Sequence, residues 1–317
     1  MRRTASPLLH SRSLAAGRSG VLVSVTPARA GWSDVQFAVR RLIAGDTWTG
    51  TTGANELCLV LLAGDCQVVC TESGSSRGAN GRTFGPVRLG PRKDVFSSYP
   101  HAVYIPRGAR FTVTADRDTE IADCRAPATT ALPARLIRPA DCGCEVRGGG
   151  SATRQIIDIL PPDAVADHLL ICEVLTPGGN WSSYPPHKHD VHRPPVEGDL
   201  EETYYYRFRH ADGYGVQRLY TADGRVDDTM TVRHGDLVLV REGYHPFAAA
   251  YGYDAYYLNV LSGSQRSMAA SDDPRYAHLR RTWPAPDPRV PLVPVPRGLK
   301  ARAANVSGDR TTSPAPQ

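Results

Sequence analysis

The chain has 317 residues, 41% of them apolar, which is enough to bury a large core and favours two domains of moderate size. Its formal net charge is +5, but residues 1–33 carry five arginines and no acidic residue, so the remainder is neutral (5 − 5 = 0). The remaining arginines are dispersed, which argues against nucleic acid as a partner. The longest apolar run, Leu57 to Ala63, is far shorter than the ~20 residues of a membrane-spanning helix, so we expect no membrane association.

Short β-branched or aromatic runs recur along the chain, separated by Gly, Pro, Asp and Ser, and they predict an all-β protein. We expect a flexible basic tail at residues 1–19, because this segment is acid-free and has little to bury. A loop rich in glycine and serine is expected at residues 73–82. In the first half we predict strands at 20–25, 35–43, 57–63, 66–71, 102–105, 109–115 and 119–125.

A stretch rich in Pro, Cys and Gly at residues 126–150 is typical of a connection between domains. We therefore expect a first domain at 20–140, a second at 141–292 and a flexible tail at 293–317. An apolar strand end followed by a glycine turn occurs once in each half, at 104–108 and at 239–243, which suggests one barrel plan used twice. In the second half we predict strands at 155–159, 168–175, 202–209, 216–221, 237–240 and 255–261.

The chain has seven cysteines, an odd number without a repeated pair spacing. This pattern does not indicate a disulfide framework, and Cys58, Cys66 and Cys172 lie in apolar strand patterns as small buried residues do. A reducing, cytoplasmic location fits this composition.

Six of the ten histidines fall between residues 187 and 245. In a strand, His187 and His189 project from the same face while Lys188 points away. On the following predicted strand, Glu202 shares the more aromatic face with Tyr204, whereas Glu201 lies on the other face. Two imidazoles and a carboxylate on a rigid sheet suit a divalent metal ion.

A fourth candidate ligand follows downstream. A strand that starts after Gly235 ends in a tight turn with Gly243, and His245 comes directly after this turn. A His-x-His pair, a later Glu and a glycine-bounded strand leading to a histidine resemble the metal motifs of the cupins in their usual order. The spacing departs from the common cupin pattern, because twelve residues separate His189 from Glu202 and Arg241 stands where proline is frequent. The residues themselves leave Asp190, His192, Glu197 and Glu201 open as rival ligands.

A more specific resemblance surrounds these ligands and runs nearly from end to end of the chain. Its main carriers are Asp46 to Gly50, Pro100 to Pro106, Glu173 to Asp190, Gly243 to Pro246 and Tyr256 to Asn259. Through these segments the chain resembles the 5-deoxy-glucuronate isomerase family of inositol catabolism, which is similar to the ketol-isomerases of uronates.

The resemblance implies two tandem cupin-type β-barrels of the jelly-roll kind, a bicupin, with the metal in the second barrel. It implies an aldose–ketose isomerisation of 5-deoxy-glucuronate to 5-dehydro-2-deoxy-gluconate through an enediol, with zinc or manganese as the metal. The first barrel lacks a matching His-x-His pair and is expected to carry no metal. The implied partner is a small sugar acid, and the sequence is compatible with a homo-oligomer.

The substrate carboxylate requires a cationic partner, because burying an unpaired anion is costly. Of four basic residues beside the motif segments, we favour Arg154 and Arg218 over Lys188 and Arg241. Arg154 belongs to a sequence segment, residues 154–156, that contributes to the family resemblance, and Arg218 lies on the strand after the one with Glu202. The catalytic base stays open, because several tyrosines and carboxylates are within reach.

Two rival functions follow from the same residues. A metal-dependent cupin dioxygenase uses similar ligands with iron, and a sugar-binding bicupin keeps the fold without turnover. The length of the family resemblance favours the isomerase over the oxygenase, and the intact metal residues argue against a purely structural role.

Overall fold

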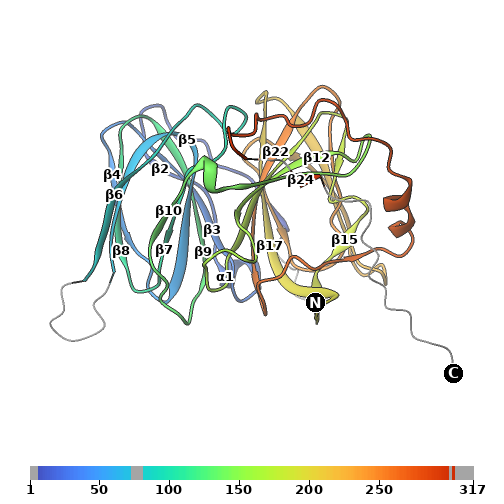
Figure 1. Ribbon diagram of the computed structural model, residues 1–317, viewed down its shortest axis with the longest axis horizontal. Helices are drawn as coiled ribbons and strands as arrows, with labels where there is room; N and C mark the ends of the chain where they lie inside the picture. Colours follow the sequence, from blue (N-terminus) through green and yellow to red (C-terminus); the bar gives the residue numbers. More distant parts are fainter. Residues whose placement is uncertain (1–5, 73–80, 300–301, 304–317) are drawn as a thin grey trace.

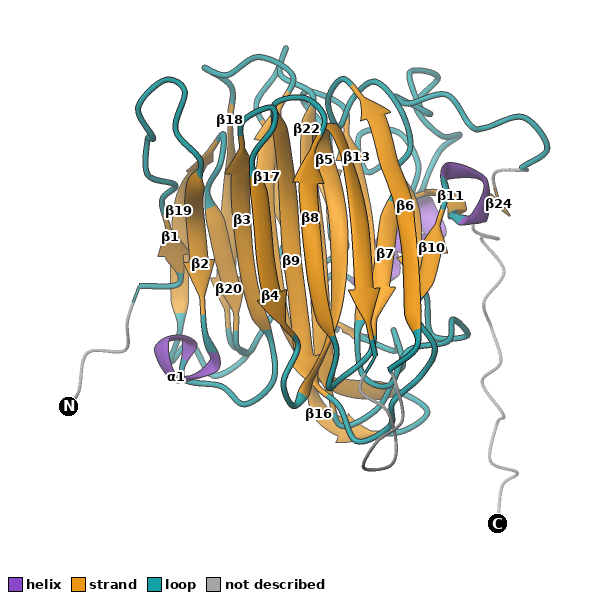
Figure 2. Cartoon of the chain, turned by 90° about the vertical axis from the view of Figure 1, so that its left-hand side faces the viewer, coloured by secondary structure: helices purple, strands orange, loops and turns teal. Residues whose placement is uncertain are grey.

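A computed structural model describes residues 6–72, 81–299 and 302–303, and it consists almost entirely of β-strands (Figures 1 and 2). The all-β prediction is confirmed. Most of the loop expected at 73–82 and most of the expected C-terminal tail lie outside the described residues. Within the described segments, no helix has both the length and the apolar character needed to span a bilayer.

In the first half of the chain, the described residues form ten strands, one short helix and one 3-10 helix. In chain order they are β1 (Leu8–Leu9), β2 (Gly20–Val25), α1 (Pro27–Ala30), β3 (Gln36–Leu42), β4 (Thr47–Thr51), β5 (Asn55–Thr71), β6 (Thr83–Arg92), β7 (Ala102–Ile105), β8 (Arg110–Ala115), β9 (Thr119–Pro127), β10 (Arg135–Ile137) and η1 (Pro139–Asp141).

The second half follows the same style. Its elements are β11 (Gly143–Arg147), β12 (Arg154–Leu160), β13 (Leu170–Thr176), β14 (Trp181–Ser182), β15 (His187–Lys188), β16 (Asp190–Arg193), β17 (Glu197–Phe208), β18 (Tyr214–Tyr220), β19 (Asp227–Arg233), β20 (Leu237–Val240), β21 (Phe247–Ala249), β22 (Ala255–Gly263), β23 (Ser271–Asp272), η2 (Ala277–Thr282) and β24 (Arg302–Ala303).

The first barrel is one curled nine-stranded sheet. Strand β5 takes part in two layers, pairing with β7 and β9 through its first half and with β6 and β8 through its second. The sequence predicts two separate strands here, at 57–63 and 66–71, but the chain runs on as a single bent strand. Gly64 makes the bend, since it adopts a φ of 102° and a side chain there would lie 2.3 Å from the backbone oxygen of Asp118.

The second barrel consists of a large sheet and a smaller one. The large sheet has the strand order β1-β20-β17-β22-β13-β12-β11-β24, with β16 attached to β17. The smaller sheet has the order β14-β21-β18-β19, and β15 pairs with β23. Figure 1 shows this half, in yellow-green to red, beside the first half in blue and green. The domain boundary that we place at 140–141 falls within η1, between the last strand of the first sheet and the first strand of the second.

Three large buried apolar clusters and one small cluster, formed by Leu170, Leu200 and Leu261, follow from the alternation of side chains along the strands. One fills the interior of the first barrel around Leu59 and Val113, and another fills the second barrel around Tyr206 and Phe247. The largest lies between the barrels, where Phe37 contacts Tyr205 with 5.7 Å between ring centroids. Each large sheet is therefore buried on both faces, which gives the two barrels a common core.

Both ends of the described chain pack on the second sheet, although the sequence predicts flexible tails there. Strand β1 pairs with β20 at one edge, and β24 pairs with β11 at the other. Val293 is fully buried, because its backbone N–H and carbonyl bond to the side-chain amide of Gln155 at 3.0 and 2.8 Å. Segments that look unstructured in the sequence are thus ordered by contacts with the edges of the second sheet and with the buried amide of Gln155.

Two buried carboxylates join the barrels. Glu173 on β13 binds Arg92 on β6 through two hydrogen bonds of 2.8 Å, and both side chains are excluded from solvent. Glu56 on β5 accepts the backbone N–H groups of residues 167–169 at 2.6 to 2.7 Å, together with the hydroxyl of Tyr104. Such buried charges are tolerated because every one is paired or hydrogen-bonded.

We predict that Glu173→Leu lowers the free energy of unfolding by about 3–5 kcal/mol, because it leaves the buried guanidinium of Arg92 without its partner. The double variant Arg92→Met with Glu173→Leu should recover much of this loss, since no buried charge remains. Urea unfolding monitored by circular dichroism measures both changes. A double variant that is no more stable than Glu173→Leu alone would contradict this account of the pair.

Candidate metal centre

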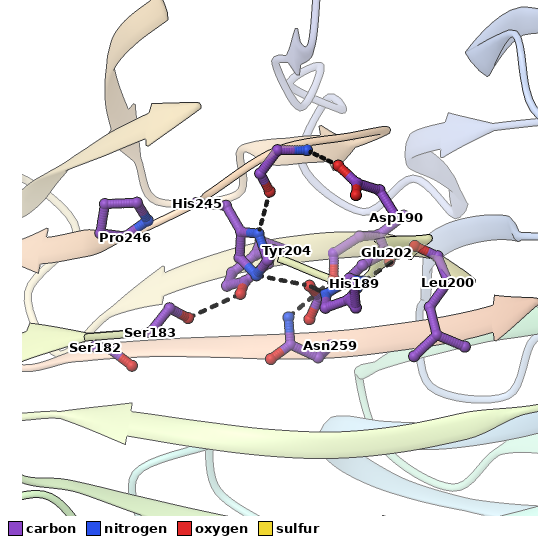
Figure 3. Close-up of polar contacts among 12 residues, drawn as sticks. Ser182, Ser183, His189, Asp190, Leu200, Glu202, Tyr204, His245, Pro246 and Asn259 are labelled. Carbon is purple, nitrogen blue, oxygen red and sulfur yellow. Dashed lines mark hydrogen bonds and ion pairs between the residues drawn. The ribbon is translucent and has the colours of Figure 1, made fainter. Parts of the chain in front are cut away.

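Three buried side chains converge inside the second barrel. His189 follows β15, Glu202 lies on β17 and His245 lies in the turn after β20 (Figure 3). One nitrogen or oxygen atom from each lies within 4.8 Å of the corresponding atoms of the other two. The structure therefore brings together three of the four residues that the sequence suggests as ligands.

The alternation of β17 places Glu202 inside the barrel. Its neighbour Glu201 points the opposite way, and its carboxylate accepts the backbone N–H groups of Ser33, Asp34 and Val35. Glu202 and Tyr204 thus share the inner face, as the pattern of the sequence indicates. A shift of register by one residue would exchange the two glutamates.

A glycine turn positions His245. Gly243 has a φ of 83°, and a side chain there would lie 2.4 Å from the backbone oxygen of Tyr220, so only glycine fits. Its N–H donates to Asp190 at 2.6 Å, and its carbonyl accepts a hydrogen bond from Nδ1 of His245 at 3.0 Å. Because the turn is tight, the one residue between Gly243 and His245 is enough to bring the His245 ring to the cluster.

The hydrogen bonds of the two histidines fix which nitrogen of each ring faces the cluster. Nδ1 of His189 donates to the carbonyl of Leu200 at 3.1 Å, and Nδ1 of His245 donates to that of Gly243. Because a carbonyl only accepts, Nε2 carries a lone pair in each ring when that ring is neutral. They lie 3.0 and 3.4 Å from the same Oε2 atom of Glu202.

Such a meeting of acceptors is repulsive unless a proton or a metal ion lies between them. His245 Nε2 is buried and has no hydrogen-bond partner among the described residues. Metal-binding histidines usually donate their other nitrogen to a carbonyl or carboxylate, as His189 and His245 do. Two imidazoles and a carboxylate are ligands that divalent transition metals prefer, so the cluster fits a divalent metal ion.

His187 lies at the edge of this cluster. Its ring centroid is 4.8 Å from that of His245 and 6.4 Å from that of His189. Strand β15 carries His187 and pairs with β23, where His187 lies opposite Asp272. The fourth residue suggested by the sequence is therefore next to the other three without belonging to the tightest group.

The protonation tendencies of the three histidines differ. Burial lowers the pKa of His245 to about 4 and that of His187 well below its ordinary value, with the neighbouring imidazoles adding to the effect. Burial also disfavours the charged form of His189, but hydrogen bonding to Glu202 outweighs it and raises the pKa of His189. Two of the three rings are therefore held in the neutral form that binds metals.

The rival ligands have other partners. Lys188 forms ion pairs with Asp190 and Glu197, and His192 bonds to the hydroxyl of Ser264 at 2.7 Å on the surface. Glu201 is held by the backbone of residues 33–35. None of these four acids and histidines joins the three-residue group among the described residues.

A cavity of about 430 Å³ extends from the cluster along the barrel interior. Its walls include Arg154, His187, Glu202, Tyr204, Tyr257 and Asn259. A smaller adjoining cavity of about 160 Å³ adds His189 and Arg280 to the walls. Each has the polar and apolar lining of a small-molecule site.

Arg154 is the buried cation of this cavity. Its guanidinium donates to the backbone carbonyls of Ala152 and Tyr184 at 3.1 and 3.2 Å, and no carboxylate among the described residues forms an ion pair with it. Burial, assisted by the nearby charge of Arg147, lowers the pKa of Arg154 to about 10. A cation that is 3% exposed and lacks an acidic partner is suited to binding an anion.

The structure does not bring Arg218, the other predicted carboxylate partner, to the cavity. Arg218 points outward from β18 and is bound at two points by Asp227, at 2.7 and 2.8 Å. Its neighbour Gln217 occupies the inner face, where its amide donates to the backbone oxygen of His245 at 2.7 Å. Strand alternation explains the difference, because adjacent residues project to opposite faces.

Some residues of the cavity were not singled out from the sequence. Ser183 has a φ of 49°, unusual for a residue other than glycine, and its hydroxyl bonds to that of Tyr204 at 2.9 Å (Figure 3). Asn259 lies on β22 opposite Tyr204. Asn259 ends one of the segments that carry the family resemblance, and the alternation places Tyr204 beside Glu202, so both signals were present in the sequence.

Comparisons with known proteins place these observations in a family. Residues 8–279 match the model of the KduI/IolB family. The chain is 46% identical over 256 residues to the 5-deoxy-glucuronate isomerase of Geobacillus thermodenitrificans (strain NG80-2), covering 80% of this chain and 89% of that protein. It is 40% identical to the 5-deoxy-glucuronate isomerase of Bacillus subtilis (strain 168), covering 80% of this chain and 90% of the relative.

Solved structures agree with the sequence matches. An IolB-like protein from Salmonella typhimurium LT2 is 38% identical, with a TM-score of 0.77, and the match covers 85% of this chain and 97% of that one. A variant of the oxalate decarboxylase of Bacillus subtilis is 14% identical, with a TM-score of 0.58 and coverage of 87% and 79%. The latter likeness concerns the fold alone, that of a double cupin, and it agrees with the predicted fold class.

We predict that Glu202→Gln loses most of its bound metal, whereas Glu201→Gln keeps it, because only the carboxylate of Glu202 faces the two histidines. Elemental analysis after dialysis against a divalent metal measures the content. Circular dichroism should show the same β-rich spectrum for both variants. Equal metal content in the two variants would remove Glu202 from the site.

Proposed function

The chain belongs to the KduI/IolB family, and from this premise we propose that it is a 5-deoxy-glucuronate isomerase, which converts 5-deoxy-glucuronate to 5-dehydro-2-deoxy-gluconate in the catabolism of myo-inositol. The observation that carries the proposal is the 46% identity to a relative of that name over 89% of the relative's length. The buried histidine and glutamate cluster lies beside a cavity lined by Arg154, which has no ion pair within the described residues, and together they supply the groups that such chemistry needs.

We assign His187, His189, Glu202 and His245 as the residues that hold a divalent metal ion, with zinc or manganese as the metal. Three imidazole nitrogens and one carboxylate oxygen suit either metal. When bound, such an ion supplies a Lewis acid that stabilises the negative charge developing as a proton leaves the carbon beside the carbonyl. Leu200 and Gly243 orient His189 and His245 for this purpose through their backbone carbonyls.

Arg154 binds the carboxylate of the sugar acid in this proposal. Its guanidinium is already desolvated within the protein, so pairing with an anion removes an unfavourable buried charge. Arg147 and Arg280, which line the smaller cavity, are occupied by Glu145 and Asp272 through paired hydrogen bonds. This leaves Arg154 as the cation with capacity for a substrate carboxylate.

The hydroxyl groups of the substrate face polar side chains of the same cavity. Tyr204 is oriented by Ser183, and Asn259 lies opposite Tyr204 on the neighbouring strand. Isomerisation moves a proton between two adjacent carbons, and the cavity offers Asp158 and the hydroxyls of Tyr204 and Tyr257 as groups that exchange protons. Burial raises the pKa of both tyrosines, which keeps their hydroxyls protonated as donors.

We place the enzyme in the cytoplasm. Its seven cysteines are free and buried, as expected for a protein of a reducing compartment. The partner that the proposal requires is a small sugar acid.

We predict that the purified protein, loaded with zinc or manganese, converts 5-deoxy-glucuronate to a ketone, and that chelation of the metal abolishes the reaction. Nuclear magnetic resonance of the product identifies the keto carbon. Readdition of the metal should restore turnover, which distinguishes metal dependence from damage by the chelator. A metal-loaded protein that leaves 5-deoxy-glucuronate unchanged would overturn the proposed function.

We predict that Arg154→Ala raises the KM for 5-deoxy-glucuronate by about 10-fold to 100-fold and leaves the metal content unchanged, because it removes a charge-assisted contact to the carboxylate. Arg218→Ala is the matched control and should have a KM within about twofold of the parent, since Arg218 faces away from the cavity. Steady-state kinetics and elemental analysis measure both. A larger effect from Arg218→Ala than from Arg154→Ala would contradict the assignment.

A further inference from the structure

One residue in the wall of the larger cavity has an unusual backbone conformation. Ser183 has a φ of 49°, and within residues 6–72, 81–299 and 302–303 no other residue except glycine has a positive φ. Residues with a side chain seldom adopt this left-handed conformation, and those that do gather at functional sites. Ser183 is buried and borders the cavity, so its conformation is held by the surrounding protein.

The left-handed turn brings two neighbouring side chains to the same side of the chain. In an extended strand, adjacent residues project to opposite faces. Ser182 on β14 is fully buried, yet Ser183 also points inward and bonds to the hydroxyl of Tyr204 at 2.9 Å (Figure 3). The next ring, that of Tyr184, contacts the exposed Trp181 with 5.2 Å between centroids. The turn at Ser183 therefore adds a second hydroxyl to the interior of the barrel.

The hydroxyl that Ser183 holds belongs to a residue beside the candidate metal cluster. Tyr204 lies two residues from Glu202 on the same face of β17, and both residues line the larger cavity. The ring centroid of Tyr204 is 5.9 Å from that of His245. A substrate oxygen bound at the cluster is therefore next to the part of the wall that carries Tyr204.

Four buried hydroxyls form a chain in this wall. Ser182 bonds to Tyr257, Ser183 bonds to Tyr204, and Ser183 also lies within hydrogen-bonding reach of Tyr257. Each hydroxyl carries one hydrogen, so the three links of the chain use three of the four hydrogens. These four hydroxyls have no other partner in the described part of the protein. One O–H is therefore available to a ligand.

The free hydrogen belongs to one end of the chain, because each inner hydroxyl donates to its neighbour. The two ends are Ser182 and Tyr204, and only Tyr204 lines the cavity. When Ser183 donates to the oxygen of Tyr204, the hydrogen of Tyr204 is left for a ligand. The position of Ser183 thus decides whether Tyr204 acts as a donor toward the cavity.

We propose that Tyr204 is a catalytic residue that donates a hydrogen bond to the substrate oxygen on which negative charge develops during isomerisation, and that Ser183 is its positioning residue. This inference rests on the proposed function. The left-handed backbone of Ser183 fixes the direction of its hydroxyl, and that hydroxyl fixes the direction of the O–H of Tyr204. A donor held in place before the reaction stabilises developing charge without rearranging, and one such donor accelerates a reaction by roughly 10²–10³-fold.

The first test is Tyr204→Phe, which removes the donor and keeps the ring. We expect kcat for 5-deoxy-glucuronate to fall about 100-fold, with KM within about threefold of the parent and metal content unchanged. Tyr253→Phe is the matched control, since it removes a hydroxyl that bonds to Asp212 at the surface, and it should keep kcat within about twofold. A kcat of Tyr204→Phe within about threefold of the parent would overturn the inference. A parent inactive on 5-deoxy-glucuronate would instead overturn the proposed function.

Two variants of Ser183 separate positioning from stability. Ser183→Gly and Ser183→Ala both remove the hydroxyl, but only glycine adopts the left-handed backbone without strain. We expect kcat to fall about tenfold in both variants, although Ser183→Gly should unfold at a higher urea concentration than Ser183→Ala. If kcat returned to the parent value in Ser183→Gly together with stability, the role of Ser183 would be structural and the positioning role would be wrong.

A double variant shows whether Ser183 acts through Tyr204. Combining Ser183→Gly with Tyr204→Phe should give the kcat of Tyr204→Phe alone, within about twofold, because the group that Ser183 positions is already absent. Steady-state kinetics of the parent, the two single variants and the double variant measure this coupling. Losses in kcat that multiply, as they do for independent sites, would contradict the assignment of Ser183 to Tyr204.

Discussion

The second barrel depends on three metal-binding atoms that meet among buried side chains. Nε2 of His189, Nε2 of His245 and Oε2 of Glu202 point at one another, and the backbone carbonyls of Leu200 and Gly243 hold both rings in that orientation. With both rings neutral, the lone pairs repel, so the surrounding structure holds the arrangement and a proton or a metal ion between the atoms completes it. The glycine turn places His245 at the cluster, and the register of β17 places Glu202 there.

The second barrel carries the cluster, and the first barrel supports it. The first barrel has an interior of apolar side chains such as Leu59 and Val113. Its outer surface covers one face of the large sheet of the second barrel, and Glu202 lies on the opposite face of that sheet. Ion pairing between Arg92 and Glu173 holds the contact in place. The rigidity of the site thus derives partly from a domain that carries none of its assigned ligands.

Much of this could be read from the sequence, for identifiable reasons. Alternation along a strand separates Glu202 from Glu201, and the His-x-His pair together with the glycine turn before His245 indicates the remaining candidate ligands. For Arg218 the sequence indicates a position on the strand after the one with Glu202, but it does not specify the register, and the structure pairs Arg218 with Asp227 while Gln217 bonds to the backbone of His245. The single bent strand through Gly64 and the packing of residues 8–9 and 293 depend on distant partners, so no local pattern reveals them.

The strands at the two edges of the large second sheet come from the extremes of the described chain: β1 covers β20, and β24 covers β11. Open sheet edges invite pairing with other molecules, and very short edge strands offer them little to pair with. Strand β20 is made more than 200 residues after β1 along the chain, so this edge stays bare until the N-terminal segment, already synthesised, returns to it. Protection of this edge against aggregation thus depends on a contact between residues far apart in the chain, and we expect an extension fused close to residue 8 to act on solubility before it acts on catalysis.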